Sequence, residues 1–135
     1  MPFRLGKGSK GMPELHGGSL RGRRLLVVED EYVIASDLTQ ELEGGGAEVI
    51  GPAATVEEAL ELTASEARID GAVLDINLRG KEVYPVADVL RERGVPFIFA
   101  TGYDNWNISQ AYADVPRLEK PVDMNALARL LAERL

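Results

Sequence analysis

Short, unbroken apolar runs alternate along this chain with longer stretches in which apolar residues recur every three or four positions. The first run, residues 24–28, ends in three acidic residues, and the stretch behind it carries a helical stripe that the glycines at 44–46 stop. A short unbroken run is typical of a strand buried on both faces, as in a parallel sheet. The pairing of strand and helix recurs five times, which predicts an α/β fold with helices on both faces of a parallel sheet.

The residues between these segments indicate where the elements begin and end. Thr55 and Glu58 have the spacing of a capping box and open the second helix. Pro85 fits only near the start of the third helix, and Asp123 caps the last one. Pro116 suggests that the fifth strand lies at a sheet edge. The five expected strands are residues 24–28, 47–50, 72–74, 96–100 and 115–118.

The segment between the fourth and fifth strands gives the weakest pattern. Residues 103–114 are mostly polar with little periodicity, and residues 104–107 have the composition of a turn. Only about two helical turns can follow before the fifth strand begins. The sequence therefore predicts a fourth helix that is short or mobile.

Charge divides the chain into a basic leader and an acidic body. Residues 1–24 carry a net charge of +5 and the rest of the chain −12. Because the leader is rich in glycine, we expect residues 1–22 to form a flexible arm and residues 23–135 a single domain. The acidic body argues against nucleic-acid binding by the domain itself. No apolar run approaches the ~20 residues of a membrane span and no secretion signal stands near the start, so a cytoplasmic location without membrane contact is expected.

Two residue types are nearly missing. Cysteine is absent, and the single histidine, His16, lies in the leader. Disulfides, thiolate nucleophiles and cysteine zinc sites are therefore excluded, and neither a Ser-His-Asp triad nor a histidine-rich metal site is expected.

Polar side chains collect where the expected strands end. Glu29 and Asp30 follow the first strand, and Asp75 follows the third. Thr101 follows the fourth strand and Lys120 the fifth. The carboxyl ends of parallel strands meet at one edge of an open sheet, where such folds bind their ligands. We therefore expect three carboxylates, a hydroxyl group and an ammonium group to converge at this edge.

Three neighbouring carboxylates repel one another, so the expected site needs a cation. Mg²⁺ is a hard divalent cation that prefers oxygen ligands of this kind. Together with Lys120, it would balance the negative charges of Glu29, Asp30 and Asp75. A balanced site suits phosphoryl transfer, in which a carboxylate can accept the phosphoryl group as an acyl phosphate.

Four motifs in order make residues 24–135 resemble the receiver domain of two-component response regulators. Asp75 lies 45 residues after Asp30, and Lys120 lies 45 residues after Asp75, which agrees with the spacing in that family. The resemblance implies a doubly wound, CheY-like and flavodoxin-like sheet of five parallel strands in the order 2-1-3-4-5. The motifs are Val27-Val28-Glu29-Asp30-Glu31, Leu74-Asp75-Ile76-Asn77, Ala100-Thr101-Gly102 and Glu119-Lys120-Pro121.

A narrower resemblance connects the chain with the FAT GUY group of receivers, whose members are often stand-alone domains. This group is associated with histidine kinases of the HWE and related types. The strings that carry it are residues 96–103, 75–80 and 83–88.

The receiver resemblance implies a role for each residue at the sheet edge. Asp75 would accept the phosphoryl group, Thr101 would hydrogen-bond it after transfer, and Lys120 would pair with Asp75 and then with the phosphate. Mg²⁺ would be held by Glu29, Asp30, Asp75 and the backbone carbonyl of Asn77. A cis bond before Pro121 is also implied.

The same resemblance implies a stand-alone phosphoacceptor that promotes its own phosphorylation and dephosphorylation and is otherwise not an enzyme. Its partners would be a histidine kinase of the HWE or a related type, or a phosphotransfer protein. It would then signal by protein–protein contact, for example with a downstream regulator. Because Leu135 ends the last expected helix, no appended output module is expected.

The chain departs from the receiver family at one position. Receivers usually carry an aromatic switch residue three positions before the lysine, where this chain has Arg117, and Tyr103 is a candidate substitute.

Two other functions remain open. One alternative is a small Mg²⁺-dependent phosphatase with an aspartyl nucleophile, although Asn77 stands where such enzymes need a second acid. The other is a non-phosphorylated flavodoxin-like binding module, although no glycine-rich loop follows the first strand.

Overall fold

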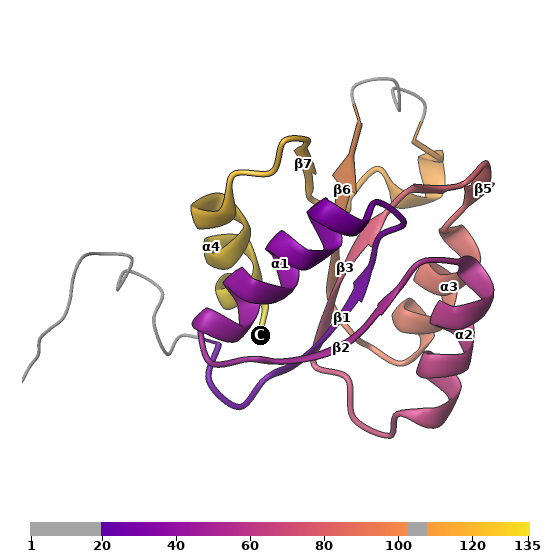
Figure 1. The fold of residues 1–135 in the computed structure, drawn as a ribbon. Coiled ribbons are helices and arrows are strands. Elements are labelled where there is room, and N and C mark those ends of the chain that lie inside the picture. Colours follow the sequence, from indigo (N-terminus) through magenta and orange to yellow (C-terminus); the bar gives the residue numbers. More distant parts are fainter. Residues whose placement is uncertain (1–19, 103–107) are drawn as a thin grey trace, which may run out of the picture.

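A five-stranded parallel sheet forms the centre of the molecule (Figure 1). The computed structural model describes residues 20–102 and 108–135. The strands lie in the order β2-β1-β3-β6-β7. With β6 and β7 as the fourth and fifth strands of the sheet, this is the predicted order 2-1-3-4-5, and the predicted fold class is confirmed. The strands are β1 (Arg24–Val28), β2 (Glu48–Ala53), β3 (Gly71–Asp75), β6 (Phe97–Thr101) and β7 (Arg117–Glu119).

Helices cover both faces of this sheet, as predicted. Figure 1 shows α1 and α4 on one side and α2 and α3 on the other. The strands supply both layers of the core because successive side chains point to opposite faces. In β6, for example, Phe97 and Phe99 pack toward α2 and α3, whereas Ile98 and Ala100 pack toward α1 and α4. The helices are α1 (Tyr32–Gly44), α2 (Val56–Ser65), α3 (Tyr84–Glu92) and α4 (Met124–Arg134).

The register of the parallel strands brings their carboxyl ends level with one another. Val28 pairs with Leu74 across β1 and β3, and Asp75 pairs with Ala100 across β3 and β6. Thr101 pairs with Glu119 across β6 and β7. The residues that end these strands or directly follow them therefore share one edge of the sheet.

The predicted start of α2 is confirmed. The hydroxyl of Thr55 accepts a hydrogen bond from the backbone N–H of Glu58 at 3.0 Å. The carboxylate of Glu58 accepts in return from the N–H of Ala54 at 2.8 Å, one residue earlier than in the usual capping box. Pro85 lies in the first turn of α3, where a proline leaves no intrahelical hydrogen bond broken.

Removing this cap has a measurable cost. We expect Thr55→Ala to lower the free energy of unfolding by about 1 kcal/mol, because the N–H of Glu58 loses its acceptor. Denaturant titration measures the change. Thr55→Ser keeps the hydroxyl and serves as the control, with stability close to that of the parent. An equal loss in both variants would show that the methyl group of Thr55, rather than the cap, is responsible.

Two features extend the fold beyond the predicted elements. A small antiparallel hairpin of β4 (Asn77–Leu78) and β5 (Lys81–Glu82) lies between β3 and α3. Leu20, which the sequence places in the leader, is fully buried in the core layer of α1 and α4. Its backbone N–H donates to the carbonyl of Gly45 at 3.2 Å, so packing begins ahead of residue 23.

The region of the predicted fourth helix is short, as expected. Between β6 and β7, the described residues contain one 3₁₀ turn, η2 (Gln110–Tyr112). The alternative prediction of mobility concerns residues 103–114, of which residues 103–107 lie outside the described residues. Tyr112 is anchored by stacking on Tyr84 of α3, with ring centroids 5.0 Å apart.

The Lys120–Pro121 bond is cis, as the family resemblance implied, and the Gly51–Pro52 bond is cis as well. Within the part of the chain that the structure describes, no helix combines the length and the apolar character that a membrane span requires.

Candidate functional site

Three carboxylates come together at the carboxyl edge of the sheet, as predicted. Glu29 and Asp30 directly follow β1, and Asp75 is the last residue of β3. One oxygen from each lies within 4.8 Å of the other two. Glu29 and Asp75 are only 2% and 4% exposed, whereas Asp30 is half-buried. Water therefore screens little of the repulsion between Glu29 and Asp75.

Lys120 neutralises part of this charge. It follows β7, and its Nζ lies 2.9 Å from Glu29 Oε1 and 3.2 Å from Asp75 Oδ2. Burial alone would lower the pKa of Lys120, but its hydrogen bonds and the charges of Glu29 and Asp75 outweigh this and raise the pKa above its usual value. The ammonium group therefore stays positive and ties β1, β3 and β7 together.

The pKa of the Asp75 carboxyl group lies well above its ordinary value. Burial is the largest cause that raises its pKa, and the negative charge of Glu29 adds to it, so the pKa reaches about 7. Lys120 and the backbone N–H of Asn77, 3.3 Å from Asp75 Oδ1, act in the opposite direction. A bound cation would favour the carboxylate form for the same electrostatic reason.

The oxygen atoms of the site fit a hard divalent cation. Glu29 Oε1 is buried and accepts no hydrogen bond from a described residue. Lys120 Nζ lies 2.9 Å from Oε1 as an ion-pair partner, but it donates its hydrogen bond to Oε2, at 3.2 Å. The backbone N–H of Glu31 also donates to Oε2, at 3.0 Å. Carboxylate oxygens with a free lone pair and no nitrogen or sulfur ligand nearby are the donors that Mg²⁺ prefers.

A pocket of about 300 Å³ opens over these groups. The predicted ligand Asn77 stands in its wall, and its side-chain oxygen accepts from the N–H of Gly80 at 2.9 Å. Thr101 is buried at the end of β6, and its neighbour Gly102 lines the pocket in its place. The residues lining the pocket are Asp30, Glu31, Asp75, Asn77, Arg79, Gly80, Gly102 and Lys120.

The tip of the β4–β5 hairpin also forms part of this wall, which no sequence pattern predicted. The backbone N–H of Arg79 donates to Asp30 Oδ2 at 3.2 Å, which fixes one of the three carboxylates. A two-residue turn is usually recognised from Asn-Gly or Asp-Gly. The Arg79-Gly80 pair gives a weaker signal, and strands of two residues show no periodicity.

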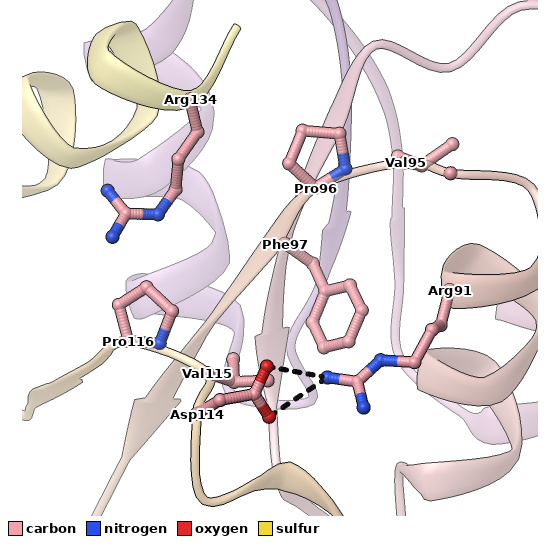
Figure 2. Close-up of a pocket in the computed structure, with 9 residues that line it drawn as sticks. Arg91, Val95, Pro96, Phe97, Asp114, Val115, Pro116 and Arg134 are labelled. Atoms are coloured by element: carbon pink, nitrogen blue, oxygen red, sulfur yellow. Dashed lines mark hydrogen bonds and ion pairs between the residues drawn. The ribbon is translucent and has the colours of Figure 1, made fainter.

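A larger pocket, of about 470 Å³, lies at the opposite edge of the sheet, where β6 and β7 begin (Figure 2). Its polar groups already have partners among the described residues. Arg91 pairs with Asp114 at 3.3 Å and lies over the rings of Phe97 and Tyr112. Arg134 donates to the carbonyl of Leu130 at 3.1 Å. Of these two pockets, the smaller one therefore holds the groups that are suited to chemistry.

Comparisons with known proteins point to one group. No family model matches the chain. The phyllosphere-induced regulator PhyR of Methylorubrum extorquens is 43% identical over 82 residues, which are 58% of this chain and 30% of that protein. The chain spans between 30% and 53% of the lengths of the curated relatives it matches.

Solved structures extend the likeness over nearly whole chains. SdrG from Sphingomonas melonis Fr1 is 40% identical, with a TM-score of 0.74 over 82% of this chain and 93% of that one. A second SdrG structure, in a BeF3-activated conformation, is 36% identical, with a TM-score of 0.69 over 90% of this chain and 100% of that one. The receiver domain of the hybrid histidine kinase CckA is 28% identical, with a TM-score of 0.68 over 83% and 98%.

Proposed function

The chain belongs to the response regulator receiver domains and hence to two-component signalling, and from this premise we propose that it is a phosphoacceptor. Asp75 takes a phosphoryl group from a histidine kinase or a phosphotransfer protein, in a reaction that depends on Mg²⁺. The kinase is of the HWE or a related type, in keeping with the FAT GUY string at residues 96–103. The BeF3-activated structure of SdrG supports the proposal, since fluoride complexes of this kind stand in for phosphoryl groups.

The proposal rests on the surroundings of Asp75. Its carboxylate lies in the wall of an open pocket, 3.2 Å from an ammonium group and within 4.8 Å of two further carboxylates. A nucleophilic oxygen needs a partner that neutralises the phosphoryl group as it arrives, and Lys120 supplies one positive charge at this point.

The residues of the site have different roles in the transfer. A bond forms between an Asp75 carboxylate oxygen and phosphorus, while the bond from phosphorus to the donor histidine nitrogen breaks and leaves its electron pair on the imidazole. Lys120 turns from Asp75 to the new phosphoryl oxygens, and Thr101 donates a hydrogen bond to them. Glu29, Asp30, Asp75 and the carbonyl of Asn77 would hold Mg²⁺, which supplies charge neutralisation when bound.

The output is a protein–protein contact. The aspartyl phosphate carries about −1.5 to −2 charge in place of the −1 of the carboxylate and adds three acceptor oxygens, enough to shift the Thr101 loop and the surface beside it. A downstream regulator in the cytoplasm reads that surface. A phosphatase with an aspartyl nucleophile fits less well, because Asn77 replaces the second acid and its side-chain oxygen already accepts from Gly80.

The test uses a small phosphodonor. We expect incubation with acetyl phosphate and Mg²⁺ to add the mass of one phosphoryl group to the protein, and removal of the metal with EDTA to prevent this. Without a bound cation, the phosphoryl group would approach the negative charges of Glu29 and Asp30 unscreened. Intact-mass spectrometry measures both samples. The same extent of adduct with and without the metal would contradict the proposed Mg²⁺ dependence, and no adduct in either would contradict the phosphoacceptor role.

A further inference from the structure

Arg79 occupies a backbone conformation that an arginine rarely adopts. It forms, with Gly80, the two-residue turn between β4 and β5, and the φ angles of the two residues are +54° and +87°. Turns of this kind favour Asn-Gly, because a side chain with a Cβ atom meets the next carbonyl oxygen when φ is positive. Placing an arginine here costs about 1 kcal/mol or more relative to glycine.

The surroundings hold this turn firmly against the pocket. The N–H of Arg79 donates to Asp30 at 3.2 Å, and the N–H of Gly80 donates to Asn77 Oδ1 at 2.9 Å. Directly after the turn, the ammonium group of Lys81 pairs with Glu57 at 2.7 Å. Arg79 thereby becomes part of the wall that also contains Asp75 and Lys120.

The guanidinium group of Arg79 differs from the neighbouring cations in having no partner among the residues that the structure describes. Lys81 is paired with Glu57, and Lys120 is paired with Glu29 and Asp75. Arg79 makes neither a side-chain hydrogen bond nor an ion pair with any of residues 20–102 and 108–135. An exposed cation in the wall of an acidic pocket, with no partner in the described part of the chain, is available to a group that enters from solution.

The net charge of the site becomes more negative when the phosphoryl group is transferred to Asp75. Before transfer, Lys120 and a bound Mg²⁺ balance the three carboxylates. After transfer, the aspartyl phosphate brings about −2 in place of −1, which leaves the site with roughly one uncompensated negative charge. Among the residues lining the pocket, Arg79 is the cation that remains to meet it.

We propose that Arg79 binds the phosphoryl group, donating hydrogen bonds from its guanidinium to the phosphoryl oxygens while the group moves onto Asp75 and while it remains there. This rests on the proposed function. With acetyl phosphate as donor, an Asp75 oxygen bonds to phosphorus, the bond from phosphorus to the acyl oxygen breaks, and acetate leaves with its electron pair. Arg79 changes no bond in this step and stabilises the charge on the oxygens.

The experiment compares Arg79→Asn with Lys81→Gln, each of which removes one positive charge from the hairpin. Asparagine suits the positive φ and keeps the backbone N–H on Asp30, so the fold and the metal site are retained. We expect Arg79→Asn to slow adduct formation by acetyl phosphate and to weaken beryllofluoride binding, each by about tenfold. Lys81→Gln should leave both unchanged, and Mg²⁺ affinity should stay level or rise in Arg79→Asn.

Equal rates and equal beryllofluoride affinities in the parent and Arg79→Asn would overturn the proposal and leave the phosphoacceptor role intact. A loss of the same size in Lys81→Gln would also overturn it, because the effect would then be general charge attraction. Weaker Mg²⁺ binding in Arg79→Asn would assign the residue to the metal site instead. If the parent protein itself forms no adduct, the proposed function fails rather than the role of Arg79.

Discussion

Replacing Asp75 with asparagine is expected to abolish the phosphoryl adduct completely. The amide is uncharged and a far weaker nucleophile than a carboxylate, so an acyl phosphate cannot form at this position. The change is nearly isosteric, and the side-chain oxygen can still accept the N–H of Asn77, now 3.3 Å from Oδ1. Loss of the adduct would therefore reflect the loss of the nucleophile and not unfolding of the protein.

Intact-mass spectrometry after incubation with acetyl phosphate and Mg²⁺ measures this effect. Asp88→Asn is the matched control, since Asp88 is an exposed residue of α3 outside the pocket, and it should form the adduct as the parent does. An adduct of undiminished extent in Asp75→Asn would move the acceptor to another residue, with Glu29 and Asp30 as the first to examine.

The second large effect concerns stability in the absence of metal. The pKa of Asp75 is about 7 in the folded protein against an ordinary value of 3.8, so between these values the folded state binds more protons than the unfolded state. The free energy of unfolding therefore falls as the pH rises from about 4 to about 7. The difference in pKa corresponds to a loss on the order of 4 kcal/mol across this window.

The other shifted groups leave this window largely undisturbed. Asp70 and Glu57 have lowered pKa values, which increase stability with rising pH, but this gain is complete near their ordinary values of 3.8 and 4.5. The raised pKa of Lys120 keeps its ammonium group charged throughout. The decline in the free energy of unfolding between about pH 5 and pH 7 is therefore assigned to Asp75.

Urea titrations in EDTA at several pH values measure the decline. Asp75→Asn cannot titrate, so we expect its stability to change little over the same range and to exceed that of the parent above pH 7 by a few kcal/mol. Saturating Mg²⁺ should restore the stability of the parent protein, since it binds the deprotonated site. A decline in Asp75→Asn as steep as in the parent would show that another group titrates.

The sequence predicted most of the candidate site because one rule applies to all of its residues. Glu29, Asp75 and Thr101 end buried strands or directly follow them, and Lys120 follows the more exposed edge strand β7. The carboxyl ends of parallel strands lie together. Their placement therefore needs only the strand boundaries. Unbroken apolar runs mark these boundaries clearly for β1, β3 and β6, whereas Pro116 and Arg117 interrupt the pattern at β7.

What the sequence did not reveal depends on contacts rather than on periodicity. Leu20 is a single apolar residue in a glycine-rich stretch, and its burial requires the core layer of α1 and α4 to be in place. The β4–β5 hairpin consists of two-residue strands held partly by Asp30, 49 positions from Arg79 in the sequence. Neither feature produces a repeating pattern along the chain.

The ion pairs of Lys120 join positions that are far apart in the sequence. Lys120 lies 91 residues from Glu29 and 45 residues from Asp75, so the pocket exists only when both ends of the domain have joined the sheet. A fragment ending before β7 would retain three mutually repelling carboxylates and lose the ammonium group that neutralises them. Metal binding and phosphoryl acceptance thus belong to the complete cooperative unit, and a ligand in the pocket stabilises the domain from β1 to β7 as a whole.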